Sequence, residues 1–265
     1  IYDISFITHP QYHTDINRNH CVKATNDAIK YADTIITLSK HGKSELLSHF
    51  SIDKDRIQIT PLAAHDTFKP INNTQWCLEK YHIPPDYILF IGTLEPRKNL
   101  KTLLVSYLAL PLEIKEKHNL VIAGGEGWLH NEIDQLIKRN QKHIRYLGYV
   151  PEQDLPSLYS GALFFVYPSY YEGFGLPILE AMACGTPVIT SDVSSMPEIT
   201  GDAAILCNPH DYLEFSNKLL MLINDEGLRS ELSKKGVIRA AQYSWEDTAI
   251  KTLKIYKDTN NSISR

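Results

Sequence analysis

Two glutamates in one glycine-containing stretch could bind a polar ligand together. Glu172 directly precedes Gly173, Phe174 and Gly175, and Glu180 lies eight positions after Glu172. An ionised carboxylate only accepts hydrogen bonds, so either residue could bind the paired hydroxyls of a ribose or another sugar. The two glycines permit unusual backbone conformations and the close approach of a ligand. The alternative is a simple glycine turn followed by two surface glutamates on a helix.

Two adjacent cations, Arg97 and Lys98, could bind phosphate. They lie in a loop that follows an apolar run ending at Ile91 and begins with Gly92. Arginine can bind phosphate oxygens in bidentate fashion, and both cations would offset charge that grows on a leaving diphosphate. The alternative is a solvated basic pair on the surface.

Alternating strands and helices are expected to position these residues. The apolar runs predict strands at Tyr87–Ile91, Leu120–Ala123, Ile144–Leu147, Ala162–Tyr167, Val188–Thr190 and Ala203–Leu206. Helices are predicted from about Leu100 and at Leu129–Arg139, Gln153–Ser160, Ile178–Cys184, Tyr212–Asn224, Glu226–Gln242 and Trp245–Tyr256. This order predicts an α/β, Rossmann-like domain with a parallel sheet over residues 86–243. Ligands of such sheets bind at the carboxyl ends of the strands, where the glycine loops should gather. The N–H groups at the start of the helix after Gly175 would favour an anion there.

The first 60 residues show the same alternation but are too few for a complete sheet. We expect a strand end at residues 1–7, a loop up to residue 20, a helix at Val22–Tyr31, a strand at Asp33–Leu38, a helix at Lys40–Phe50 with Ser39 as its N-cap, and a strand at Ile57–Thr60. Residues 61–85 are expected to be a linker with a short helix near Trp76–Tyr81, and residues 258–265 a frayed tail. Since the chain begins with Ile1 inside an apolar run, we expect a fragment of a longer protein.

The composition excludes several classes of function. Of 265 residues, 43% are hydrophobic and 22% charged, as in soluble globular proteins. A net charge of −4 gives no support for nucleic-acid binding. The four cysteines lack CxxC spacing and the eleven histidines lack metal-site spacing, which indicates a reducing compartment and no metal. The Gly124–Gly127 stretch lacks the Lys-Ser/Thr of a P-loop, so a tight turn is expected. No apolar run approaches the ~20 residues of a membrane span.

The stretch from Val166 to Glu198 resembles the donor-site motif of retaining GT-B glycosyltransferases. The two glutamates enclose Gly-Phe-Gly-Leu-Pro, and Ala-Met-Ala-Cys-Gly-Thr-Pro-Val-Ile follows. The segment GTLEPRKN around Arg97 is similar to the phosphate-binding loop of group 1 bacterial mannosyl- and glucosyltransferases. Those enzymes act in polysaccharide or lipopolysaccharide synthesis. The resemblance implies that residues 1–60 are the end of the acceptor domain, 61–85 a linker, 86–243 the nucleotide-sugar donor domain, and 244–257 a helix that crosses back to the first domain.

The resemblance also implies an activity: transfer of mannose or glucose from GDP-mannose or UDP-glucose to an acceptor hydroxyl, with retention of configuration and without metal or cofactor. Arg97, Lys98 and Glu172 would be the catalytic residues, with the cations on the diphosphate. Glu180 would bind the ribose. The remaining donor-binding residues implied are Gly92, Tyr149, Val150 and Leu155, the last three beside the nucleobase, and Gly173, Phe174, Gly175 and Leu176 on the sugar and phosphate. The acceptor would be a glycan or a lipid-linked glycan. We expect a cytoplasmic protein, and contact with the inner face of the membrane through a preceding N-terminal part stays open.

One departure from the family keeps two alternatives open. The segment Tyr2-Asp3-Ile4-Ser5-Phe6 matches a family pattern His-Asp-Leu-Ser-Phe, in which the histidine approaches the transferred sugar. Tyrosine stands in the place of that histidine. This departure favours one alternative, a non-catalytic nucleotide-sugar-binding module. The other alternative is a nucleotide-sugar epimerase of the same architecture, which would lack the paired Glu172 and Glu180.

Overall fold

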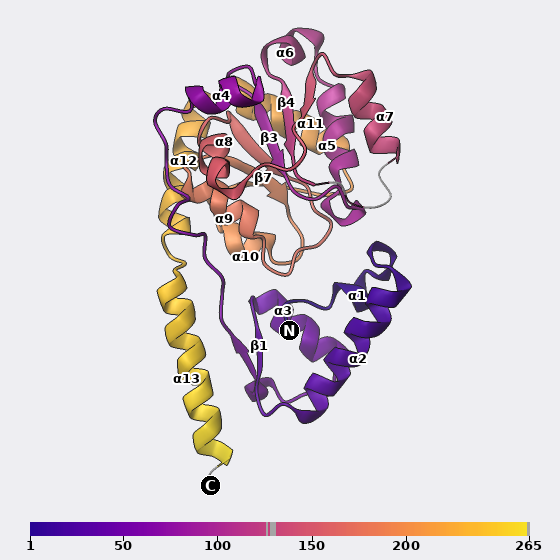
Figure 1. Ribbon diagram of the computed structural model, residues 1–265, viewed down its shortest axis with the longest axis vertical. Helices are drawn as coiled ribbons and strands as arrows, with labels where there is room; N and C mark the ends of the chain where they lie inside the picture. The colour runs from indigo at the N-terminus through magenta and orange to yellow at the C-terminus, as the bar shows by residue number, and fades with distance from the viewer. Residues whose placement is uncertain (126, 128–130, 264–265) are drawn as a thin grey trace.

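A six-stranded parallel sheet forms the centre of the larger part of the chain (Figure 1). This computed structural model describes residues 1–125, 127 and 131–263. The spatial order of the strands is β5-β4-β3-β6-β7-β8. In chain order they are β3 (Ile88–Ile91), β4 (Leu120–Ala123), β5 (Ile144–Tyr146), β6 (Phe164–Tyr167), β7 (Val188–Ser191) and β8 (Ile205–Cys207). The winding direction reverses between β3 and β6, which is where ligands bind in open α/β sheets. The predicted fold class is confirmed.

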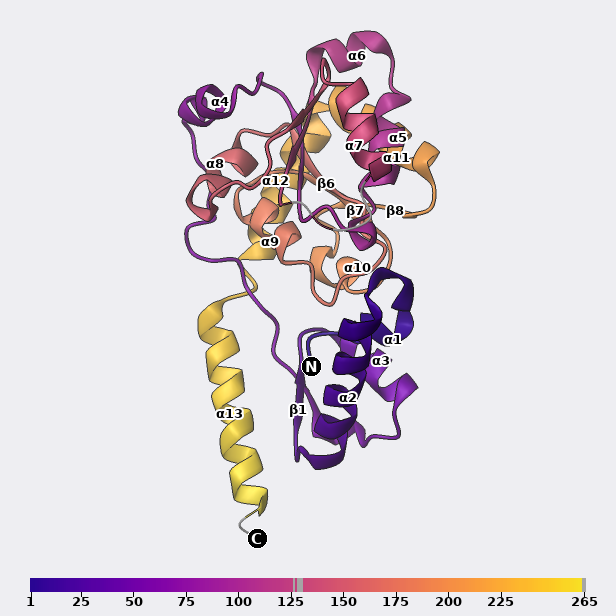
Figure 2. The same ribbon diagram turned by 45° about the vertical axis from the view of Figure 1, so that its right-hand side comes forward.

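Helices cover both faces of this sheet (Figures 1 and 2). The strands β4, β6 and β7 are buried along their whole length, as apolar parallel strands must be when both faces are covered. Helix α5 packs against α11, and α9 packs against α12. The helices are α4 (Gln75–Tyr81), α5 (Leu100–Leu108), α6 (Leu112–Lys117), α7 (Asn131–Arg139), α8 (Leu155–Ser160), α9 (Leu176–Ala183), α10 (Met196–Thr200), α11 (Tyr212–Asn224) and α12 (Glu226–Ala240).

The smaller part has its own sheet and its own core. Strands β1 (Ile35–Thr37) and β2 (Ile57–Ile59) pair in parallel beside the helices α1 (Ser5–Thr8), α2 (Asp15–Tyr31) and α3 (Lys40–His49). A separate cluster of buried side chains fills the space between them: Ile4, Phe6, Ile35, Leu46 and Ile57. Two cores in one chain agree with the division expected near residue 60, although the domain boundaries remain a prediction.

Helix α13 (Trp245–Ile263) leaves the larger part and runs along the smaller one (Figures 1 and 2). Near its start, the Thr248 hydroxyl donates to the Pro61 carbonyl at 2.6 Å, and near its end Thr259 and Thr34 share a hydrogen bond of 2.8 Å. The linker that begins at Pro61 and helix α13 are the two connections between the parts, and they lie side by side at Pro61 and Thr248. None of the helices within the described residues combines the length and apolar character that a bilayer span requires.

Three expectations about local structure are wrong. Residues 5–7 belong to helix α1 instead of a strand, because Asp3 Oδ1 accepts from the backbone N–H of Ser5 and turns the chain. Residues 15–20 belong to α2 instead of a loop, because Thr14 caps the helix by accepting from the Asn17 N–H. Residues 258–263 continue α13, since no glycine or proline ends it there.

The predictions for the larger part differ mainly at element ends. Helix α9 begins at Leu176, where Gly175 takes a left-handed conformation with φ of 102°. A 3-10 turn at Glu152–Asp154 precedes α8. The short helices α6 and α10 were not expected from the sequence. The start predicted for the helix at Leu129–Arg139 lies outside the described residues, which resume at Asn131.

Candidate functional site

The loops after β3 and β6 meet at the carboxyl edge of the sheet, and a buried asparagine joins them. Asn99 begins α5 with φ of 53°, a left-handed conformation that asparagine tolerates better than most residues. Its side-chain amide donates to the carbonyls of Pro168 at 2.9 Å and Pro209 at 2.8 Å. One side chain thus ties the loops after β3, β6 and β8, which fixes the 3-10 turn Pro96–Lys98 just before it.

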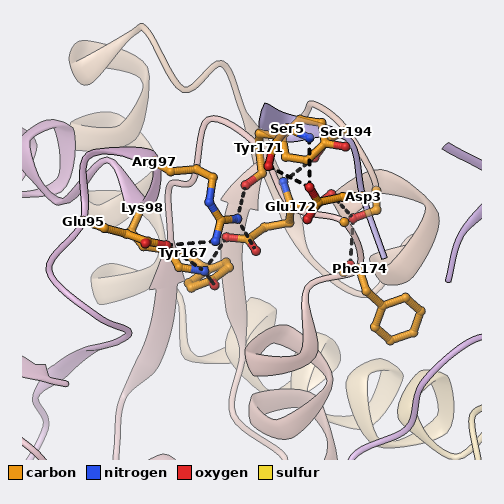
Figure 3. Close-up of polar contacts among 12 residues, drawn as sticks. Asp3, Ser5, Glu95, Arg97, Lys98, Tyr167, Tyr171, Glu172, Phe174 and Ser194 are labelled. Carbon is orange, nitrogen blue, oxygen red and sulfur yellow. Dashed lines mark hydrogen bonds and ion pairs between the residues drawn. The ribbon is translucent and has the colours of Figure 1, made fainter. Parts of the chain in front are cut away.

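This arrangement brings Arg97, Lys98 and Glu172 into direct contact (Figure 3). Arg97 Nη1 donates to Glu172 Oε2 at 2.9 Å and to the Tyr171 carbonyl at 2.8 Å. Lys98 Nζ donates to the other carboxylate oxygen, Oε1, at 2.8 Å. Arg97 Nη2 also donates to Glu95 at 2.8 Å. Two cations and two carboxylates therefore form one cluster with no net charge.

The cluster is nearly shielded from water, which strengthens its ion pairs. Glu172 is 6% exposed as a residue, and the Arg97 and Lys98 side chains are 19% and 12% exposed. Burial raises the pKa of Glu172, but Lys98 and Arg97 outweigh burial and lower that pKa to about 2. Lys98 Nζ also donates to the Tyr167 hydroxyl at 2.6 Å. Glu172 is consequently an ionised hydrogen-bond acceptor at any physiological pH.

The glycine loop around Glu172 is held by hydroxyl groups from the segment after β7. The Glu172 N–H donates to Ser194 Oγ at 3.0 Å (Figure 3), and Ser195 Oγ lies 2.8 Å from the carbonyls of both Glu172 and Phe174. Gly175 then begins α9, and no side chain caps the first turn of that helix. The free N–H groups and the helix dipole of α9 favour an anion at this end.

Glu180 lies apart from this cluster, within α9. Its carboxylate accepts from the Tyr159 hydroxyl at 3.0 Å. Burial raises the pKa of Glu180 to about 7, with the Tyr159 hydrogen bond opposing and Glu152 adding to the rise. The pKa values of the two glutamates in this motif are therefore shifted in opposite directions, because Glu172 is ion-paired with Arg97 and Lys98 whereas burial dominates at Glu180. A hydroxyl-rich ligand would supply the donors that Glu180 lacks.

The residues expected beside a nucleobase have unequal exposure. Tyr149 is 77% exposed, whereas Val150 is only 5% exposed and belongs to the hydrophobic core. Leu155 is partly buried against the same core. Tyr149 and Leu155 thus present side-chain surface after β5, and Val150 mainly fills the core.

The glycines after β3 and β4 serve loop packing. A Cβ on Gly124 would lie 2.0 Å from the Gly92 carbonyl oxygen, and one on Gly127 would lie 2.3 Å from the Leu94 carbonyl oxygen. The tight turn expected at Gly124–Gly127 stays a prediction, because Glu126 lies outside the described residues.

The smaller part of the chain contacts the glycine loop through residues that sequence reasoning did not connect with it. Ser39 Oγ caps α3 by accepting from Gly42 N at 3.0 Å and also donates to the Gly173 carbonyl at 3.0 Å. Glu198 accepts from the N–H groups of Lys40 and His41 at 3.0 and 3.1 Å. The first turn of α3 is therefore completed by the larger part. The sequence feature that could have pointed to this contact is the segment SSMPE, which ends at Glu198.

Across residues 1–125, 127 and 131–263, no group of three or more His, Cys, Asp or Glu side chains is arranged to hold a metal ion. All four cysteines are free thiols.

Comparisons with known proteins agree with the geometry. The sequence pattern of the family described as "Glycosyl transferases group 1" matches residues 79–239. The O-antigen chain mannosyltransferase B of Escherichia coli is 41% identical over 97% of this chain and 68% of its own length. The serotype-specific mannosyltransferase WbdA of E. coli is 32% identical over 82% of this chain and 28% of its own length.

Solved structures show the same architecture. The sucrose-phosphate synthase of Thermosynechococcus elongatus has a TM-score of 0.81 and 25% identity, covering 98% of this chain and 66% of its own. Anabaena Alr3699/HepE, solved in complex with UDP and glucose, has a TM-score of 0.80 and 19% identity over 98% of this chain and 70% of its own. The chain thus spans about two thirds of these structures.

Proposed function

Because the chain belongs to the group 1 glycosyltransferases, we propose that it transfers mannose from GDP-mannose to a hydroxyl of a glycan acceptor, with retention of configuration. The observation that carries this proposal is the cluster of Arg97, Lys98 and Glu172 at the reversal point between β3 and β6. Mannose is preferred over glucose because the 41% identical relative is a mannosyltransferase. Synthesis of a bacterial surface polysaccharide is the corresponding setting.

The two cations have a direct role in this proposal. A sugar nucleotide carries a diphosphate, and transfer leaves additional negative charge on the leaving group. Arg97 and Lys98, together with the uncapped N-terminus of α9, would bind the diphosphate and stabilise that charge in a partly water-excluded site. No metal is needed for this role.

The two glutamates would divide the donor between them. Glu172, ionised and held by the cations, can accept hydrogen bonds from sugar hydroxyls near the diphosphate. Glu180, with Tyr159 as its hydrogen-bond donor, can accept the ribose hydroxyls. Tyr149 and Leu155 would border the base, and the backbone from Gly173 to Leu176 would contact the sugar and phosphate.

Retention in this proposal does not use a carboxylate nucleophile. Retaining glycosidases use such a nucleophile, and its negative charge must be available to the sugar. The Glu172 carboxylate instead receives hydrogen bonds from Arg97 and Lys98 on both oxygens. The acceptor hydroxyl would therefore attack on the face from which the diphosphate leaves, and the leaving phosphate would take its proton. Contacts between the two parts of the chain would limit access of water.

Isothermal titration without added metal tests the donor site. We expect GDP to bind and GDP-mannose to bind, with UDP and UDP-glucose much weaker. Arg97→Ala should weaken GDP binding by about tenfold to a hundredfold, since hydrogen bonds to charged groups contribute about 1.5–3 kcal/mol. Lys101→Ala is the matched control, because Lys101 is exposed and pairs with the exposed Glu132, outside the cluster of Arg97, Lys98 and Glu172.

Each outcome decides between the alternatives. Preferential binding of UDP would overturn the choice of GDP-mannose, and equal binding by the Arg97→Ala variant would overturn the assigned diphosphate site. Donor binding without transfer to any glycan would favour a non-catalytic nucleotide-sugar-binding module. Product analysis by NMR, which distinguishes α from β linkages, would test retention.

A further inference from the structure

A buried tyrosine without a role in the proposed transfer lies beside the cation cluster. Tyr167 is the last residue of β6, which pairs with β3, and it has no exposed surface. Its ring stacks on Phe165 at 5.7 Å and on Phe90 at 6.4 Å. Its backbone carbonyl accepts from the Thr190 hydroxyl at 2.7 Å. Strand pairing and ring stacking therefore fix the place of the Tyr167 hydroxyl.

This hydroxyl holds one of the two cations (Figure 3). Lys98 Nζ donates to the Tyr167 hydroxyl at 2.6 Å and lies 5.1 Å from the centre of the ring. It also donates to Glu172 Oε1 at 2.8 Å, whereas Glu95 Oε1 is 4.0 Å away, beyond hydrogen-bond distance. An ammonium has three protons, and the described residues supply hydrogen-bond acceptors for two of them. One proton of Lys98 is therefore left for a ligand.

The Tyr167 hydroxyl orients Lys98 without neutralising its charge. Burial raises the pKa of Tyr167 well above its ordinary value of 10, and the charge of Glu172 adds to the rise. Tyr167 is consequently a neutral phenol at physiological pH. Because the two cations and two carboxylates of the cluster already balance, a carboxylate in the place of Tyr167 would make the cluster negative and repel an anionic ligand. The flexible four-carbon stem of a lysine gains more from such support than the rigid fork of an arginine.

We propose that Tyr167 is a positioning residue, which holds Lys98 Nζ so that its remaining proton is donated to the diphosphate of the donor. The inference rests on the proposed function, in which Lys98 binds that diphosphate. The Lys98 side chain is 12% exposed, so a ligand can reach it. An ammonium that is already held loses less conformational entropy when the ligand binds. Without the hydroxyl, Nζ could move toward Glu95, whose charge would compete with the diphosphate.

Four variants separate this role from a contribution to packing. Tyr167→Phe removes the hydroxyl and keeps the stacked ring. Tyr107→Phe is the matched control, because Tyr107 is equally buried near the far end of α5 and donates to the backbone carbonyls of His118 at 2.9 Å and His143 at 3.0 Å. Lys98→Met removes the ammonium, and the double variant Lys98→Met/Tyr167→Phe completes a double-mutant cycle.

Calorimetry with GDP measures the effect on ligand binding. We expect Tyr167→Phe to weaken GDP binding about fivefold, the order expected for one lost hydrogen bond, and Tyr107→Phe to leave it unchanged. In the Lys98→Met background, Tyr167→Phe should have no further effect, since a positioning residue acts through Lys98. Equal GDP binding by Tyr167→Phe and wild type would overturn the proposal, as would an undiminished effect of Tyr167→Phe in the Lys98→Met background.

A second measurement needs no nucleotide. The ¹⁵N NMR signal of the Lys98 ammonium, identified by its absence in Lys98→Met, reports how fast its protons exchange with water. These protons should exchange more slowly in the wild type than in Tyr167→Phe, because the hydroxyl holds the ammonium. Equal exchange in the two proteins would overturn the positioning role. Failure of the wild type to bind any nucleotide would instead overturn the proposed function, because the exchange measurement does not depend on a ligand.

Discussion

Replacing Glu172 by glutamine should lower the free energy of unfolding, because the substitution removes a charge that the cation cluster stabilises. The substitution keeps the size and one acceptor oxygen but removes the charge that Arg97 and Lys98 contact at 2.9 and 2.8 Å. The pKa of Glu172 falls from an ordinary 4.5 to about 2 in the folded protein. At ~1.4 kcal/mol per pH unit, this difference corresponds to about 3 kcal/mol of stability contributed by the ionised carboxylate.

The direction of the pH dependence follows from the lowered pKa. Ionised Glu172 stabilises the fold fully above pH 4.5, and this contribution is lost as the pH falls toward 2. The wild type should therefore exceed Glu172→Gln by about 3 kcal/mol at pH 7. By pH 3.5, about 1 kcal/mol of this advantage should be gone. Urea unfolding of both proteins at the two pH values, followed by circular dichroism, measures the difference directly.

Glu180→Gln provides a control with the opposite sign. Because the pKa of Glu180 is raised to about 7, its ionisation costs stability increasingly from pH 4.5 to 7. Glu180→Gln should consequently gain stability relative to the wild type over that range, whereas Glu172→Gln should not. An equal stability loss for Glu172→Gln at pH 7 and pH 3.5 would refute the argument that the cations hold Glu172 ionised.

Two further substitutions and one control variant test how the loops are held. Ser39→Ala removes the α3 cap and the bond to the Gly173 carbonyl, and should cost about 1–2 kcal/mol in urea unfolding; an unchanged midpoint would contradict this. Gly124→Ala should greatly lower the thermal midpoint, since its Cβ would meet the Gly92 carbonyl oxygen at 2.0 Å at a φ of 143°. Gly125→Ala, whose added Cβ would have no atom of the described residues within 4 Å, should leave that midpoint nearly unchanged.

Local sequence patterns were sufficient to predict strands β1 to β8, whereas the strand end expected at residues 1–7 is wrong. The apolar run before Pro168 and the glycines after it gave the strand β6 and the turn into α9. Helix α2 was predicted too short because most of its residues are exposed and polar, so its sequence shows little helical periodicity. Its start depends on the Thr14 cap, a signal that many loops also contain.

The contacts of the site depended on the order of strands in space. Arg97 and Glu172 are ion-paired because β3 and β6 are neighbours, and sequence periodicity does not state which strands are adjacent. Ser39 was correctly predicted as an N-cap from its local sequence. Its second contact, with the Gly173 carbonyl 134 positions away, depends on how the two parts of the chain meet.

The contacts of α3 also bear on the order in which the chain folds. Glu198 completes the first turn of α3 from 158 positions away, and Thr259 contacts Thr34 across 225 positions. Closing such long loops is slow compared with forming the helices and neighbouring strands of residues 86–243. Residues 1–60 are made before their partners during synthesis, yet their α3 turn gains its last acceptors only after α10 exists. We therefore expect residues 1–60 to reach their final structure late, with folding of the larger part as the step that they await.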